Sequence, residues 1–126
     1  MTSINELEHI AKGLGIRHFR GVFMKDVLPR KIRKKECGIV NLEDFEDKGS
    51  HWICYFKNEK QNIFFDSYGA DPPVEVKQYL GKNVFVSTFQ IQAFGTPICG
   101  EFCLHVLKRF DEGESIVDII LSLYYK

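Results

Sequence analysis

The sequence lacks the long apolar segments that would insert a protein into a membrane. No run approaches the ~20 consecutive apolar residues needed to cross a bilayer, and the first six residues contain no basic segment followed by an apolar stretch. It also has no charge excess, because seventeen basic and seventeen acidic side chains cancel. We therefore expect a soluble, non-secreted protein without membrane contact, and any nucleic-acid binding must be local.

Paired short cysteine spacings, which mark zinc sites, are also missing. Cys99 and Cys103 are close in sequence, but Cys37 and Cys54 form no second short pair. Without a secretory signal, cysteines belong to a reducing compartment, where disulfides are rare. We expect free thiols, no metal and no required cofactor.

The chain has enough apolar material for one domain spanning residues 1–126, since 44% of it is hydrophobic and eleven residues are Phe. Apolar periodicity predicts helices at residues 4–14, 99–110 and 116–125, and Asp71-Pro72-Pro73 predicts a helix entry that leads into Val76, Tyr79 and Leu80. Short apolar runs predict strands at residues 37–40, 52–56, 63–65 and 84–86. Residues 19–28 show a mixed pattern.

Cys99 is the candidate nucleophile because it opens the clearest predicted helix. Unpaired backbone N–H groups and the helix dipole at that end favour a thiolate. Cys103 on the same apolar stripe and Cys54 in an aromatic strand are expected to be packing residues. His105 is an unsuitable base for Cys99, because six residues of helix rise about 9 Å and place it on the polar face.

His51 and Asp66 stand at the two open ends of a predicted hairpin. An even-length turn centred between Asn58 and Glu59 places them directly opposite each other, with their Cβ atoms about 5 Å apart. Tyr55 would then pair with Asn62, and Ile53 with Phe64. The spacing thus predicts a His–Asp pair that depends on the strand register.

Several motifs together resemble the adenovirus maturation proteases, a family grouped with the proteases of ubiquitin-like proteins and with relatives in virophages and Polinton-type elements. They occur in the family's order, and a further likeness extends over residues 6–15 and 37–41. The motifs are Gly49-Ser50-His51-Trp52, Phe65-Asp66-Ser67-Tyr68-Gly69, Gln92 and Ile98-Cys99-Gly100. The resemblance implies an α+β fold: a central, mostly antiparallel sheet packed against a helix that starts with the catalytic cysteine, flanked by N- and C-terminal helices.

The resemblance also implies roles for four residues of a cysteine protease. Cys99 would attack the scissile carbonyl, His51 would act as general base, and Asp66 would orient the histidine. Gln92 would supply an oxyanion-hole N–H group, with Gln90 as the alternative for that role.

A narrow groove for glycine-rich sites is a further implication of the resemblance. It would be bordered by Trp52, Gly69 and Gly95, although a glycine in a turn is more often only a turn residue. Cleavage near glycine in viral capsid or core precursors would follow, by a monomer in the virion and in the cytoplasm or nucleus of the infected cell.

Activation is less well defined by the residues. The family carries a cysteine, between the acidic residue and the nucleophile, that bonds an activating peptide, but no cysteine lies between Cys54 and Cys99 here. DNA stimulation would use the basic run Arg30, Lys31, Arg33, Lys34 and Lys35, for which a solvated loop is the more usual interpretation.

Two alternatives of other classes remain. One is an isopeptidase that removes a ubiquitin-like modifier, and the other is an inactive, protease-like virion component. The absence of long substrate-binding additions disfavours the first, and the complete set of candidate catalytic residues disfavours the second.

Overall fold

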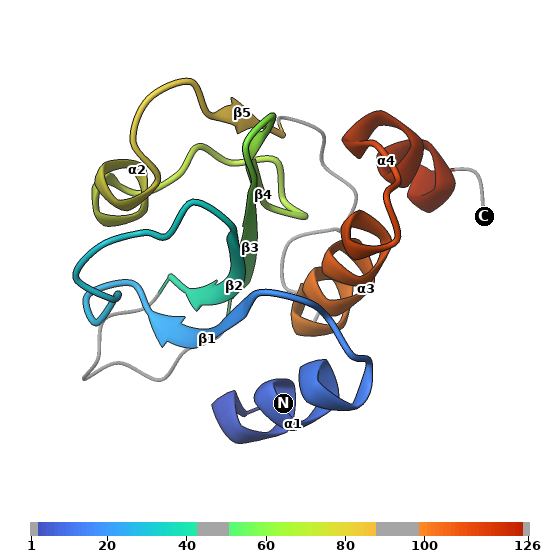
Figure 1. The fold of residues 1–126 in the computed structure, drawn as a ribbon, viewed down its shortest axis with the longest axis horizontal. Coiled ribbons are helices and arrows are strands. Elements are labelled where there is room, and N and C mark those ends of the chain that lie inside the picture. Colours follow the sequence, from blue (N-terminus) through green and yellow to red (C-terminus); the bar gives the residue numbers. More distant parts are fainter. Residues whose placement is uncertain (1–2, 43–50, 88–98, 125–126) are drawn as a thin grey trace.

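The protein has an α+β fold, and in the part of the chain that the structure describes four helices pack around a five-stranded sheet (Figure 1). The computed structural model describes residues 3–42, 51–87 and 99–124, with Cys99 and Tyr124 described by their backbone. Helices α1 and α4 lie near the N- and C-terminal ends of the chain, as predicted. In chain order the elements are α1 (Ile4–Gly13), β1 (Phe19–Met24), β2 (Glu36–Asn41), β3 (Trp52–Lys57), β4 (Asn62–Phe65), α2 (Val74–Leu80), β5 (Phe85–Val86), α3 (Cys99–Asp111) and α4 (Ile116–Tyr124).

The sheet is mixed, which corrects the expectation of a mostly antiparallel one. Its strand order is β1-β2-β3-β4-β5; the two inner pairs are antiparallel, whereas β1 runs parallel to β2 and β4 parallel to β5. Parallel neighbours need crossover connections, and the loop after β1 and helix α2 provide them. Strand β1 was missed in the sequence because a register shift between Phe19 and Gly21 interrupts its alternation.

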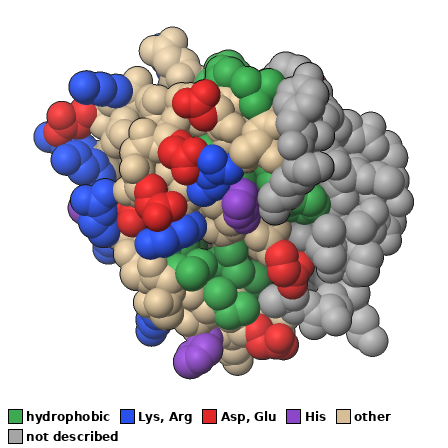
Figure 2. Space-filling model, turned by 90° about the vertical axis from the view of Figure 1, so that its right-hand side faces the viewer, with side chains coloured by type: hydrophobic (Ala, Val, Ile, Leu, Met, Phe, Trp, Pro, Cys, Tyr) green, Lys and Arg blue, Asp and Glu red, His purple; other side chains and the backbone are tan. Residues whose placement is uncertain are grey.

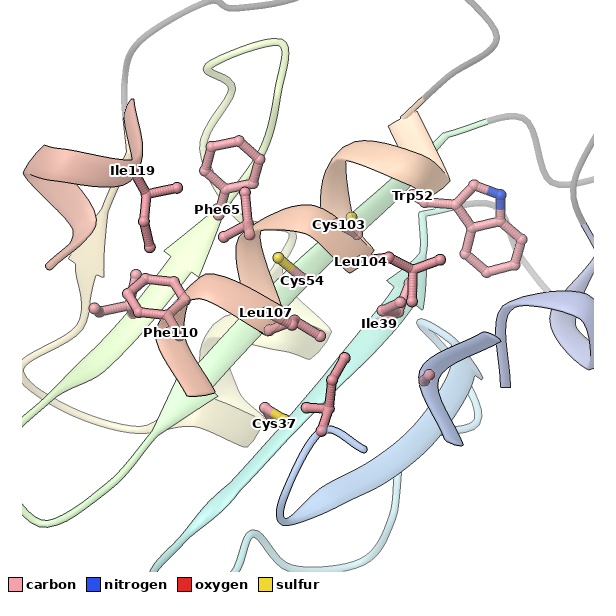
Figure 3. Packing of buried hydrophobic residues seen from close by; sticks show 14 of the residues in the cluster. Cys37, Ile39, Trp52, Cys54, Phe65, Cys103, Leu104, Leu107, Phe110 and Ile119 are labelled. Atoms are coloured by element: carbon pink, nitrogen blue, oxygen red, sulfur yellow. The ribbon is translucent and has the colours of Figure 1, made fainter. Parts of the chain in front are cut away.

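The two faces of the sheet carry separate apolar cores. Helices α1, α3 and α4 cover one face, where α3 packs against β3 and β2 around side chains such as Cys54, Leu104 and Leu107 (Figure 3). Helix α2 covers the smaller core on the other face, with Tyr55, Phe64 and Leu80. Because β3 is buried from both sides, it is the central strand of the molecule.

Three cysteines are packing residues, which confirms the sequence interpretation for Cys54 and Cys103 and adds Cys37. Cys37, Cys54 and Cys103 are free and buried. Burial raises the pKa of the Cys37 thiol to about 12, so this thiol stays protonated at neutral pH.

The hairpin register differs by two residues from the predicted one. Strands β3 and β4 pair Tyr55 with Phe64 and Lys57 with Asn62, so the turn occupies residues 58–61. The Asn58 side chain accepts hydrogen bonds of 2.8 Å from the Lys60 and Gln61 N–H groups and closes this turn. The predicted pairings of Tyr55 with Asn62 and Ile53 with Phe64 are therefore wrong, although a two-residue shift leaves every side chain on its expected face.

A buried carboxylate ties β1, β2, β3 and α2 together. Glu36 is 1% exposed and accepts hydrogen bonds from Arg20 Nη1 (2.8 Å), the Arg33 N–H (2.8 Å), the Tyr79 hydroxyl (2.7 Å) and the Tyr55 hydroxyl. Burial alone would raise the pKa of Glu36, but these four donors outweigh it and hold the pKa below its ordinary value.

The basic run forms part of the exposed loop between β1 and β2. Arg30, Lys31, Arg33, Lys34 and Lys35 are all exposed, while Ile32 packs into the smaller core. On the side of α3 and α4, basic and acidic groups lie next to each other and form no field of one sign (Figure 2). Within the described ranges no helix is long and apolar enough to span a membrane.

Replacing Glu36 tests whether its carboxylate supports the fold. Glu36→Gln should lower the unfolding free energy at pH 7 by about 3 kcal/mol, because buried donors lose their charged acceptor. A lowered folded-state pKa stabilises fully above the ordinary carboxyl pKa of 4.5, and this stabilisation is lost as the pH falls toward the folded-state pKa. The difference from wild type should therefore be full at pH 7 and shrink as the pH falls below 4.5.

Urea unfolding at pH 7 and at pH 3.5 would measure both effects. Glu59→Gln, at an exposed turn residue, is the matched control and should change little. An equal loss at both pH values would contradict the role of the charge.

A second substitution tests the close packing of Tyr55 on β2. A Cβ atom at Gly38 would lie 2.7 Å from the Tyr55 hydroxyl oxygen, so Gly38→Ala should destabilise the fold by about 1–3 kcal/mol. Gly13→Ala is the control, because at the end of α1 its Cβ would meet nothing within 4 Å. Thermal unfolding of both variants should show a loss of stability only at Gly38.

Candidate active site

His51 and Asp66 form a direct pair at the end of the β3–β4 hairpin. His51 Nε2 lies 2.6 Å from Asp66 Oδ1, and the two side chains are 13% and 1% exposed. His51 immediately precedes β3 and Asp66 immediately follows β4. The predicted contact is confirmed, but in the observed register the two residues are diagonal neighbours rather than directly opposite.

The geometry distinguishes the two nitrogens of His51. A carboxylate accepts a hydrogen bond, so the nitrogen beside Asp66, Nε2, carries the hydrogen. Nδ1 is then the nitrogen that can accept a proton from a nucleophile when the imidazole is neutral. The pair therefore has the form of a general base with an orienting carboxylate.

Tyr68 contacts both members of this pair, a feature that the sequence interpretation missed. Its ring stacks on the His51 imidazole with 4.0 Å between centroids and 5° between planes, and its backbone N–H donates to Asp66 Oδ1 at 2.9 Å. Continuing the β3–β4 register beyond the last paired residues brings Tyr68 opposite His51. The signal in the sequence was Asn58, which favours the longer turn.

The start of α3 approaches the residue that follows His51. Cys99 is the first residue of this helix, as predicted. A Cβ atom at the buried Gly100 would lie 3.2 Å from Leu7 Cδ2 and 3.4 Å from Trp52 Cδ1, so the first turn of α3 packs between α1 and β3. The N-terminal end of a helix, with its dipole, lowers the cost of a negative charge there.

Trp52 belongs to the core rather than to an open surface. Its side chain is 5% exposed and lies with the cluster that joins α3 to the sheet (Figure 3). Strand alternation directs it to the face opposite His51, because the two residues are adjacent. The expected groove-bordering role is therefore unsupported by its burial, and Trp52 acts as the support on which the α3 N-terminus rests.

The other expected site residues have mixed outcomes. Gln92, its alternative Gln90, and Gly95 lie outside the described residues. Gly69 has a φ of 75° and donates its N–H to the Asp66 carbonyl at 2.8 Å, so it serves as a turn residue beside the pair. Among the described residues, no group of His, Cys, Asp and Glu side chains could hold a metal ion.

A separate hollow lies at the far end of β3 from His51. It has a volume of about 270 Å³, and its lining includes Arg17, Lys35, Lys57 and Phe110. None of the residues that line it belongs to the His51–Asp66 pair. This hollow is therefore separate from the His51–Asp66 pair.

Comparison with known proteins adds no family assignment. No protein-family model matches the chain, and no curated protein matches it.

The burial of Trp52 can be measured directly, because it is the only tryptophan. Its fluorescence should be blue-shifted in the native protein, and iodide should quench it several-fold less effectively than after unfolding in urea. The unfolded chain is the control for an accessible indole. Equal quenching of the two states would contradict the buried position and restore Trp52 as a groove residue.

Proposed function

We propose that the protein is a cysteine endopeptidase with Cys99 as nucleophile, His51 as general base and Asp66 as the orienting carboxylate. The observation that carries the proposal is the 2.6 Å contact between His51 Nε2 and a fully buried Asp66. A second support is the start of α3 at Cys99, beside the strand that begins after His51. A buried carboxylate that holds an imidazole, and a cysteine at the start of a helix, are both features suited to thiol activation.

The proposed reaction begins with proton transfer from the Cys99 thiol to His51 Nδ1. The thiolate sulfur then forms a bond to the scissile carbonyl carbon, and the imidazolium returns the proton to the leaving amine as the C–N bond breaks. Water, deprotonated by His51, hydrolyses the thioester and regenerates the thiol. The oxyanion would be stabilised by the Cys99 N–H and the Gln92 side chain, each contributing about 3 kcal/mol.

The substrate proposal comes from the resemblance to adenovirus maturation proteases. It assigns cleavage near glycine in viral capsid or core precursor proteins, within the virion or the infected cell. Gly69 beside Asp66 leaves that part of the site without a side chain, which suits a substrate with small residues. The exposed basic loop at residues 30–35 offers contacts for DNA as a stimulating partner.

Peptide cleavage tests this function. Purified protein should cut a panel of glycine-containing peptides, Cys99→Ala and His51→Ala should be inactive, and Asp66→Asn should reduce kcat by about 10²–10⁴-fold. The reduction follows because an amide in place of the carboxylate no longer stabilises the imidazolium. Release of the new amino terminus would be followed by mass spectrometry.

Matched controls separate chemistry from folding. Cys103→Ala removes a buried thiol one turn along the same helix, His9→Ala removes an exposed histidine, and Asp71→Asn removes an exposed carboxylate. All three should retain activity.

The same assay should include a ubiquitin-like protein with a C-terminal extension. If this fusion were the only substrate cleaved, the endopeptidase proposal would be replaced by the hypothesis of a protease that removes ubiquitin-like modifiers. No cleavage of any substrate, even with DNA present, would overturn the enzyme proposal in favour of an inactive, protease-like component.

A further inference from the structure

The turn that follows β4 is held by hydrogen bonds on both sides of Tyr68. Asp66 Oδ1 accepts from the Tyr68 N–H at 2.9 Å, and the Asp66 carbonyl accepts from the Gly69 N–H at 2.8 Å. Gly69 adopts a φ of 75°, which costs glycine little. The backbone at Tyr68 is therefore fixed relative to the carboxylate.

One carboxylate oxygen joins Tyr68 to His51. Asp66 Oδ1 lies 2.6 Å from His51 Nε2 and also accepts the Tyr68 N–H. The Tyr68 ring lies flat on the imidazole, with 4.0 Å between centroids. Each of the three residues therefore contacts the other two. The imidazole is held at its edge by a carboxylate and on its face by a phenol ring.

Among the described residues, the contacts given for Tyr68 are with His51 and Asp66 rather than with either apolar core. Its side chain is half-buried and belongs to neither apolar core. Tyr55, by contrast, lies in the smaller core and donates to Glu36. The Tyr68 ring is placed against the one side chain of the hairpin that must gain and lose a proton in the proposed reaction.

An aromatic face favours a cation stacked on it. The ring quadrupole of tyrosine is negative on its face, and cations within about 6 Å of the centroid are stabilised. Within the described part of the chain, Asp66 and Tyr68 are two titratable side chains in contact with the imidazole, and a carboxylate also favours the protonated form.

We propose that Tyr68 is a positioning residue for His51, whose ring fixes the imidazole plane and stabilises the imidazolium. The inference rests on the proposed protease function, in which the imidazolium balances the Cys99 thiolate and later donates its proton to the leaving amine. Both steps improve when the protonated imidazole is stabilised in a fixed orientation.

The first test measures the histidine without requiring activity. NMR titration of the imidazole signals would be carried out on three full-length proteins. The parent carries Cys99→Ala with Tyr68 unchanged, and the other two add Tyr68→Phe or Tyr68→Leu to it. All three variants keep the backbone N–H that bonds Asp66. Tyr68→Leu should move the titration midpoint of His51 to lower pH by about half a unit, whereas Tyr68→Phe should stay near the parent.

The exposed His9 and His18 are internal controls in every sample and should not move. An unchanged His51 midpoint in Tyr68→Leu would overturn the proposal. Equal shifts in Tyr68→Leu and Tyr68→Phe would also overturn it, because a ring would then be without effect.

The second test uses kcat/KM of peptide cleavage against pH with Cys99 intact. Tyr68→Leu should lower kcat about tenfold with little change in KM, and its alkaline limb should move to lower pH because the imidazolium loses its proton earlier. Tyr68→Phe should keep both kcat and the alkaline limb close to their wild-type values. A protein that cleaves nothing would refute the protease function, while the NMR titration would still decide the role of Tyr68.

Discussion

The pairing of β3 with β4 is the constraint on which the site and both cores depend. The Asn58 side chain closes the turn at residues 58–61, and the ladder then runs from Lys57 and Asn62 to Cys54 and Phe65. A slip by one residue would exchange the two faces and move Tyr55 out of the smaller core. A slip by two would keep the faces but separate His51 from the Tyr68 ring. The hairpin therefore determines the geometry around His51 as well as the packing of the sheet.

Glu36 stabilises strand β3 on the face of the sheet to which the His51 side chain points. Four donors from β1, β3, α2 and the loop after β1 converge on its carboxylate, so one buried charge holds segments that are distant in sequence. A buried charge is costly unless it is paired, and here hydrogen bonds and Arg20 offset that cost. Gly38 permits the arrangement, because a side chain there would collide with the Tyr55 ring.

The opposite face supplies the candidate nucleophile. Helix α3 packs its apolar stripe on β3 and β2, and Gly100 lets its first turn rest against Trp52 and Leu7. Because Trp52 follows His51, the buried indole links the helix that begins at Cys99 to the strand that begins after the histidine. The proposed site thus combines residues that come from both faces of the sheet. This arrangement explains why a residue expected at a groove is found in the core.

The sequence by itself determined the properties that local periodicity reports. The apolar stripe of α3 predicted a helix beginning at Cys99, and the parity of the hairpin placed His51 and Asp66 on one face. Cys54 and Cys103 were predicted as packing residues for the same reason. These features depend on spacings within single elements or within one hairpin, where side-chain directions follow from helix or strand geometry.

Only the tertiary structure decided the register, the parallel outer strands and the partners of Glu36 and His51. The register depends on whether Asn58 begins a turn or ends a strand, which apolar alternation does not report. The parallel pairs depend on crossovers through a loop and α2, and the stacking of Tyr68 on His51 depends on the register. The donors to Glu36 come from four segments that lie up to 43 residues from it in the sequence, so no local pattern identifies them. Such contacts are selected by the free energy of the whole packed chain, which is why they appear only when all the elements are in place.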